Sequence, residues 1–143
     1  MATLSPDGNI FSDEQTRAFL DRAAEHWRLH NFGLWVFHTA DRNFIGYGGI
    51  MHARVEDCEE VELAYAVQSR CRGMGFATEM SRAALRVGFE DLKLERIVAF
   101  TLPHNMASRR VLEHCGFIYQ RDIMHAGLPH VLYTLANRSR AAR

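Results

Sequence analysis

A short stretch in the middle of the chain, RCRGMGFATEM, places two arginines and two glycines directly before a segment with helical character. The first backbone N–H groups of a helix have no partner within the helix and lie at the positive end of its dipole. Glycine permits close approach of a ligand to the backbone, and guanidinium groups such as those of Arg70 and Arg72 bind phosphate oxygens in bidentate fashion. The stretch therefore predicts a site for a phosphate-bearing ligand.

Two common phosphate-binding motifs fit this stretch poorly. A P-loop needs GxxxxGK followed by Ser or Thr, and no lysine follows Gly73 or Gly75. A dinucleotide-binding GxGxxG motif needs a third small residue at Thr78, and its glycines come directly after a strand. The pattern present is RxxGxG, from Arg70 to Gly75, followed by FATE. A simple turn with solvated arginines is the alternative.

Hydrophobic spacing predicts the elements that position this stretch. Ser12 and Gln15 form a capping-box pattern for a first helix from about Asp13 to His30. Two more helices are expected over residues 75–92 and 105–115. Strands are expected in the segments GLWVFHT, FIGYGGIMHA, EEVELAYAVQ, ERIVAFTL, FIYQRD and HVLYTL. This order predicts a mixed α/β sheet with helices packed on it.

The strand directly before the glycines alternates between two faces. One face carries the bulky apolar side chains of Val61, Leu63, Tyr65 and Val67, and the other carries Glu62, Ala64, Ala66 and Gln68. The second face thus holds a single acidic residue among small neighbours.

Composition narrows the classes of partner. The chain has 143 residues with 17 basic and 17 acidic side chains, so broad nucleic-acid or membrane binding is not expected. Three cysteines without a CxxC pair suit a reducing compartment, and the start MATLSPDGNIFS lacks the features of a secretion signal. We therefore expect one cytoplasmic domain over residues 1–143, with a frayed tail from residue 137.

Beyond these patterns, the chain resembles the GNAT superfamily of N-acetyltransferases, in particular the branch of ribosomal-protein alanine and serine N-acetyltransferases. The resemblance rests on GLWVF, FIGYGGI, VELAYAV, RGMGFATEM and LERIVAFTLPHNMASRRVLEHCGF, in this order. It implies a single-domain α/β fold with a mixed, mostly antiparallel sheet, a central splayed strand pair and flanking helices. It also implies acetyl-CoA as co-substrate and an amine as acceptor, either a small molecule or a peptide N-terminus.

The resemblance implies which residues bind the donor. The pantetheine arm would run along the strand like an extra strand and be held at one further position. The expected donor-binding residues are Tyr65, Ala66, Val67, Arg70, Arg72, Gly73, Met74, Gly75, Phe76, Ala77, Thr78 and Asn105.

Acetyl transfer from a thioester needs a base, an oxyanion donor and an acid. Glu62 is the candidate base, acting through water, although an ordinary solvent-facing or ion-paired glutamate has the same pattern. A backbone N–H near Val67 is the candidate oxyanion donor. Many family members carry a tyrosine acid where this chain has Leu112, and Ser108 resembles the serine of the ribosomal-protein branch. A first-turn serine after an Asn105 cap is the alternative.

No metal is expected. His26 and His30 have the i, i+4 spacing of paired zinc ligands, but no glutamate lies between them as in HExxH and no third ligand is evident. A solvated helix face is the simpler interpretation. Cys115 is expected in the core, as are Trp35 and Phe37, for which the wall of the acceptor pocket is the alternative place.

The chain departs from the family at its start, where the usual first strand and helix have no counterpart. Such an absence would expose a sheet edge, so a homodimer is a reasonable hypothesis. It leaves two interpretations open: an N-acetyltransferase of unknown acceptor, or a catalytically weak acetyl-CoA-binding or regulatory protein of the same fold. A nucleotide-binding dehydrogenase is a distant third.

Overall fold

The structure is a computed structural model that describes residues 12–141. The expectations about the start of the chain, including the absent leader, strand and helix, fall on residues outside this range. In the described part of the chain, no helix combines the length and apolar character needed to cross a membrane.

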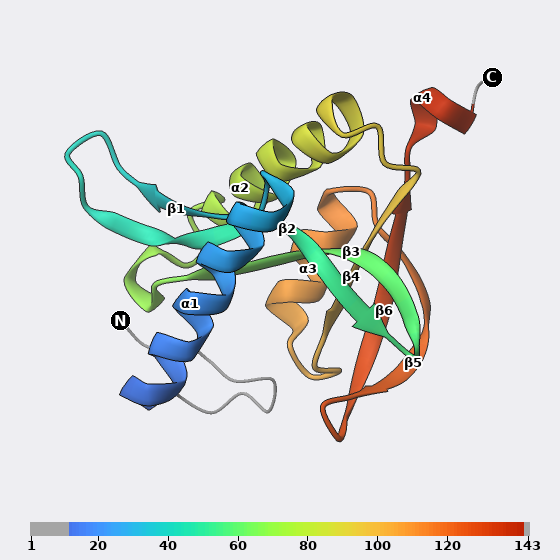
Figure 1. Cartoon of the computed structure of the whole chain (residues 1–143), viewed down its shortest axis with the longest axis horizontal. Helices are drawn as coiled ribbons and strands as arrows, with labels where there is room; N and C mark the ends of the chain where they lie inside the picture. The colour runs from blue at the N-terminus through green and yellow to red at the C-terminus, as the bar shows by residue number, and fades with distance from the viewer. Residues whose placement is uncertain (1–11, 142–143) are drawn as a thin grey trace.

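The predicted order of helices and strands is confirmed (Figure 1). The elements are α1 (Asp13–His30), β1 (Leu34–His38), β2 (Phe44–Val55), β3 (Cys58–Val67), η1 (Ser69–Cys71), α2 (Phe76–Arg86), η2 (Val87–Asp91), β4 (Arg96–Thr101), α3 (Met106–His114), β5 (Ile118–His125), β6 (Leu128–Ala136) and α4 (Arg138–Ala141). The strands form one sheet in the order β1-β2-β3-β4-β6-β5. Every neighbouring pair is antiparallel except β3 and β4, as expected for a mixed, mostly antiparallel sheet.

The capping box at the start of α1 is present in both directions. The Gln15 N–H donates to Ser12 Oγ at 3.1 Å, and the Ser12 N–H donates to Gln15 Oε1 at 2.9 Å. At the other end, Asn31 adopts the left-handed conformation typical of a helix stop. Local sequence signals therefore set both ends of this helix.

The second half of α1 contacts the sheet through polar rings. Trp27 Nε1 donates to the Leu34 carbonyl at 2.7 Å, and His26 Nδ1 lies 2.8 Å from the Phe32 carbonyl oxygen. The His52 N–H on β2 donates to His26 Nε2 at 3.0 Å. The expectation of a solvated helix face is therefore wrong for His26, because both of its ring nitrogens are bonded within the protein.

The helix predicted over residues 75–92 changes character partway. The α-helix ends at Arg86 and continues as a π-helical turn over Val87–Asp91. Gly88 in this turn is buried, and a Cβ added to it would lie 2.6 Å from Ile97 Cδ1 and 3.0 Å from Ile50 Cδ1. Close packing of this backbone on the sheet is a tertiary contact that helical periodicity does not report.

The main core lies on the face of the sheet that carries α2 and α3. It combines strand and helix side chains: Phe32, Ile50, Val61, Leu63, Ala84, Leu85, Ile97, Ala99, Leu112, Phe117, Val131 and Tyr133. Cys115 packs against it as predicted, and so does Trp35. A smaller cluster of Val55, Val98, Ile123 and Leu132 forms on the opposite face. Val61 and Leu63 thus face the main core, which leaves Glu62 on the other side of β3.

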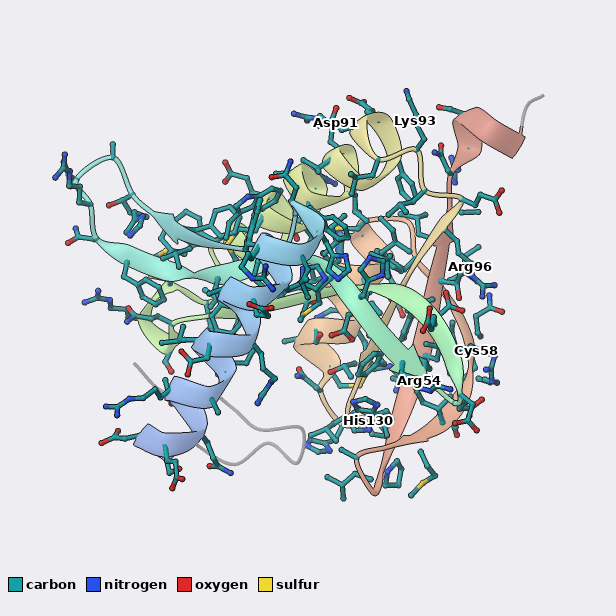
Figure 2. All side chains as sticks on the ribbon, in the orientation of Figure 1. Arg54, Cys58, Asp91, Lys93, Arg96 and His130 are labelled. Carbon is teal, nitrogen blue, oxygen red and sulfur yellow. The ribbon has the colours of Figure 1, made fainter. Side chains whose placement is uncertain are left out.

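The parallel pair β3–β4 is held at one end and open at the other. Ladder pairing links the two strands only at Glu62 and Val98. Before this point, Arg96 forms an ion pair with Glu60, and its Nε donates to Glu60 Oε2 at 3.1 Å. Figure 2 labels Arg96 on β4, on the side of the molecule that carries the β2–β3 turn with Arg54 and Cys58. After Glu62, β3 and β4 form no further ladder pairs with each other, as expected for a splayed strand pair.

The tail predicted to fray from residue 137 is ordered at its first residue. Asn137 is buried, and its Nδ2 donates to the carbonyls of Phe89 and Leu94 at 3.3 and 2.9 Å. The Asn137 N–H also donates to the Glu95 carbonyl at 2.8 Å, and α4 follows directly. The side-chain amide ties the chain end to the loop before β4, a long-range contact that charge and composition do not reveal.

Gly46 on β2 is expected to be sensitive to any side chain. A Cβ at this position would lie 2.1 Å from the Ala66 carbonyl oxygen and 3.0 Å from Val67 Cα, both backbone atoms of β3. We expect Gly46→Ala to lower the free energy of unfolding by about 1–3 kcal/mol, as overpacking does in other cores. Urea denaturation with an unchanged m value measures this; an unchanged midpoint would contradict the close approach.

Candidate active site

The glycine loop leads from the end of β3 into α2, as the sequence predicts. Gly73 and Gly75 have φ of +77° and +82°, and Gly75 is the N-cap of α2 without a side-chain cap. A Cβ added to either glycine would meet no heavy atom within 4 Å. The loop therefore faces open space, and the first N–H groups of α2, at Phe76, Ala77 and Thr78, have no capping side chain.

The cations of the loop are available to a ligand. Arg70 and Arg72 are exposed, and neither guanidinium has an ion pair or hydrogen bond within the described residues. Met74 between the glycines is 66% exposed. Positive charge, unpaired N–H groups and open space thus coincide at one helix terminus, which suits a phosphate-bearing ligand.

A groove of about 610 Å³ extends from this loop along α2. Its lining residues are Gly75, Thr78, Glu79, Arg82, Ala83, Arg86 and His114. Sequence reasoning did not predict that Arg82 and Arg86 share a groove with the loop. Thr78, Arg82 and Arg86 follow one another at intervals of four residues, and this spacing was the available signal, because such residues lie on one helix face.

The carboxyl-terminal end of β3 presents a free backbone edge. The Gln68 N–H donates to the Ile45 carbonyl on the β2 side at 2.8 Å. Successive peptide groups of a strand point to opposite edges, so those of Tyr65 and Val67 point away from β2, toward β4. β4 pairs with β3 only at Glu62. The peptide groups of Tyr65 and Val67 are therefore placed to pair with an extended ligand between the strands.

Glu62 lies where the strands begin to separate. Its register partner on β4 is Val98, and burial raises the pKa of the Glu62 carboxyl to about 7. Glu60, two residues earlier on the same face, is paired with Arg96, whereas no cation of the described residues pairs with Glu62. A carboxyl with a pKa near neutrality accepts a proton readily at physiological pH.

Tyr65 and Ser108 form a pair on the opposite face. The Tyr65 hydroxyl lies 2.9 Å from Ser108 Oγ and also donates to the Ser108 carbonyl at 3.2 Å. Burial is the main reason that the pKa of Tyr65 rises to about 12. Asn105 Oδ1 accepts the Ser108 N–H at 3.1 Å, so Asn105 is the N-cap of α3. This cap leaves the Asn105 amide NH₂ for a ligand.

The Tyr65 hydroxyl was missed by sequence reasoning, which assigned this residue to the apolar face and to backbone pairing. Leu112, at the position where many family members carry a tyrosine, is fully buried in the main core. Phe37 lines a separate cavity of about 350 Å³ with Phe76 and Met80 of α2, so it lies on the α2 face and not on the face of Glu62.

The arrangement can support proton transfer on both sides of one reacting centre. Glu62 and the Tyr65–Ser108 pair lie on opposite faces of β3, which has no ladder pairing with β4 past Glu62 and so leaves an unpaired gap. A thioester carbonyl held along β3 would have a base on one side and a hydroxyl pair on the other. The N–H of Val67 points into the same gap, where it can donate to an oxyanion.

Two curated proteins are similar to this chain in sequence. The chain is 29% identical over 120 residues to the uncharacterised protein YkkB of Bacillus subtilis, in an alignment that covers 83% of this chain and 70% of YkkB. It is 30% identical over 94 residues to the FsC-acetyl coenzyme A-N(2)-transacetylase of Aspergillus fumigatus, covering 62% of this chain but only 40% of that enzyme.

Solved structures share the fold. An acetyltransferase from Agrobacterium tumefaciens superimposes with a TM-score of 0.80 at 22% identity, covering 91% of this chain and 75% of that one. A ribosomal-protein-S5-alanine acetyltransferase from Vibrio fischeri gives 0.68 at 21% identity, covering 96% and 78%. A family model described as an acetyltransferase (GNAT) domain matches residues 3–118. With this match over most of its length, the chain belongs to the GNAT acetyltransferase family.

Proposed function

We propose that this protein transfers the acetyl group of acetyl-CoA to a primary amine by direct attack on the thioester. The observation that carries the proposal is the free edge of β3, which begins beside Glu62 and the Tyr65–Ser108 pair and ends at the glycine loop. The open loop fits a pyrophosphate, and the unpaired peptide groups of Tyr65 and Val67 fit an extended pantetheine arm.

In the proposed reaction, Glu62 takes a proton from the acceptor ammonium through a water molecule, and the free amine attacks the thioester carbonyl. The Val67 N–H donates to the oxyanion that forms, Glu62 keeps the proton of the ammonium, and the attacking nitrogen releases its second excess proton to neighbouring water. When the C–S bond breaks, Ser108 donates its proton to the thiolate, with Tyr65 in hydrogen-bond contact to replace it. Tyr65 regains its proton from the water that received the second nitrogen proton, so the products are an amide, CoA thiol and a protonated Glu62 that returns its proton to solvent, and atoms and charges balance.

We propose a small-molecule amine or a peptide N-terminus as acceptor. The names of the compared proteins include both kinds: an N(2)-transacetylase of FsC and a ribosomal-protein acetyltransferase. Three cysteines without a CxxC pair support a cytoplasmic location, and equal numbers of acidic and basic residues argue against broad binding of nucleic acid or membranes. β1 is an edge strand of the described sheet, which supports the homodimer hypothesis; a monomer by light scattering would oppose it.

The proposal is tested first by calorimetry with acetyl-CoA, using CoA and NAD as comparisons, and then by thiol release with a panel of amines and peptides. Saturable binding of acetyl-CoA and acceptor-dependent release of CoA would support it. Saturable binding without transfer to any acceptor would favour the acetyl-CoA-binding or regulatory protein. Binding of NAD in place of acetyl-CoA would overturn both.

Tyr65→Phe tests the hydroxyl pair. Loss of the Tyr65 hydroxyl leaves Ser108 Oγ without its partner, so we expect kcat to fall by about 10-fold while the KM for acetyl-CoA stays near the parent value. Ser108→Ala should lower kcat more, by about 100-fold. Steady-state kinetics with the best acceptor of the panel measure both.

The matched control is Tyr119→Phe, which removes the hydroxyl of an exposed tyrosine bonded to Asp122 on β5. Its kinetics should equal those of the parent. Parental kcat in Ser108→Ala would remove the pair from the mechanism.

A further inference from the structure

Three imidazole rings gather where α1 meets β2. His26 and His30 come from successive turns of α1, and His52 comes from β2. One nitrogen of each ring lies within 4.8 Å of the corresponding nitrogens of the other two. The ring centroids are 4.5 Å apart for His26 and His30, and 4.4 Å apart for His30 and His52. His52 is thus the third possible metal ligand, which the sequence around His26 and His30 does not reveal.

The hydrogen bonds of His26 determine its tautomer. Its Nε2 accepts the His52 N–H at 3.0 Å, so this nitrogen carries a lone pair and no proton. The proton is therefore on Nδ1, which donates to the Phe32 carbonyl at 2.8 Å. A backbone carbonyl on the far nitrogen is the arrangement that orients histidine ligands in metal sites. The lone pair of His26 consequently points toward β2 and the other two rings.

The other two rings are free to adjust. His30 and His52 are exposed, and within the described part of the chain no hydrogen bond holds their ring nitrogens. Three nitrogens around a tetrahedral Zn²⁺, each at about 2.0–2.1 Å from the metal, are roughly 3.3 Å apart. Rotation of the exposed His30 and His52 side chains, with a turn of the His26 ring away from the His52 N–H, would bring the three nitrogens to that spacing.

We propose that His26, His30 and His52 form a binding site for a divalent transition metal, with Zn²⁺ as the leading candidate. Imidazole nitrogens suit zinc, copper and nickel, and a site with three protein ligands keeps a position open to water. On binding, the metal replaces the His52 N–H at His26 Nε2. Because His52 is exposed, water takes over that N–H.

The site would act as a clamp on α1. No residue of this helix is buried, and α1 contacts the sheet through the Phe19 ring against Tyr47 and through polar contacts near its carboxyl-terminal end. A metal would join residues on α1 to one on β2 that lies 26 positions beyond His26. Binding to the folded state alone stabilises that state, so both thermal stability and the order of α1 should increase with metal concentration.

The test uses the untagged full chain, stripped of metal with a chelator. Calorimetric titration with ZnCl₂ should show one saturable site, and Co²⁺ should give the visible absorption of tetrahedral coordination. His30→Ala and His52→Ala should each weaken zinc binding by at least about 10-fold. Neither variant endangers the fold, because both rings are exposed and His52→Ala keeps the backbone N–H to His26.

His104→Ala, which removes an exposed histidine outside the cluster, is the control and should bind zinc like the parent. Hydrogen exchange of the α1 amides should slow with Zn²⁺ in the parent and in His104→Ala, and stay unchanged in His52→Ala. Absence of saturable zinc binding, or parental affinity in both His30→Ala and His52→Ala, would overturn the site. Zinc binding that leaves α1 exchange unchanged would overturn the clamp.

Discussion

Glu62→Gln is expected to lower kcat by about 100- to 10,000-fold, the range over which a positioned base contributes to proton transfer. The amide keeps the shape of the side chain and cannot accept the proton of an ammonium. In the parent, kcat/KM should rise with pH through about 7, the pKa to which burial raises the Glu62 carboxyl. The variant should lose this limb, and acetyl-CoA affinity should change little. A pH–rate profile and calorimetry measure the two effects.

The same substitution should make the folded protein more stable at neutral pH. The pKa of Glu62 is raised from 4.5 to about 7 by burial, so the folded state binds a proton that the unfolded state has released. Stability of the parent should therefore fall as pH rises between these values. Each pKa unit corresponds to about 1.4 kcal/mol, so Glu62→Gln should gain on the order of 3 kcal/mol above pH 7 and little below pH 4.5. Urea denaturation across this pH range measures the difference.

Glu60→Gln is the matched control for Glu62→Gln. Glu60 lies on the same face of β3, two residues away, but it is paired with Arg96 before the strands separate. This variant should retain the activity and the rising pH limb of the parent. If Glu62→Gln kept parental rates across the pH range, the carboxyl would have no part in the proton transfer.

Gly75→Asp is expected to weaken acetyl-CoA binding by at least about 100-fold. Gly75 has φ of +82° and faces open space, so an added side chain meets the incoming ligand and no protein atom. A carboxylate there also repels a pyrophosphate and competes for the first N–H groups of α2. Losing two charge-assisted hydrogen bonds is enough for a change of this size. Calorimetry measures the affinity, and circular dichroism checks that α2 is retained.

Gly127→Asp is the matched control. Gly127, in the turn between β5 and β6, has φ of +77° and likewise no heavy atom within 4 Å of an added Cβ. The two variants therefore introduce the same charge and similar backbone strain, which aspartate tolerates better than most residues. Only Gly75→Asp should lose acetyl-CoA affinity. Equal losses would assign the effect to stability, and parental affinity in both would contradict the loop assignment.

Local patterns were sufficient to predict the helices and strands and the glycine loop before α2. The capping box at Ser12, the alternation from Val61 to Val67 and the two glycines before α2 each report on a few neighbouring residues. Such signals act within one helix turn or one strand, so they can be identified from the sequence without knowledge of the tertiary contacts. The order of these elements was enough to predict the mixed sheet, and the resemblance of five sequence segments to the GNAT superfamily predicted the family, which the family match confirms.

The tertiary structure alone decided how side chains from distant segments meet. Tyr65 and Ser108 are 43 residues apart, and His26 and His52 are 26 apart, yet each pair is joined by a hydrogen bond. The pKa of Glu62 depends on burial beside β4, and the bonded tail at Asn137 depends on carbonyls of a loop more than 40 residues earlier. Periodicity reports which face of an element a residue occupies. Packing between elements determines which side chains that face contacts. The hydroxyl pair, the histidine cluster and the raised pKa of Glu62 all depend on such contacts.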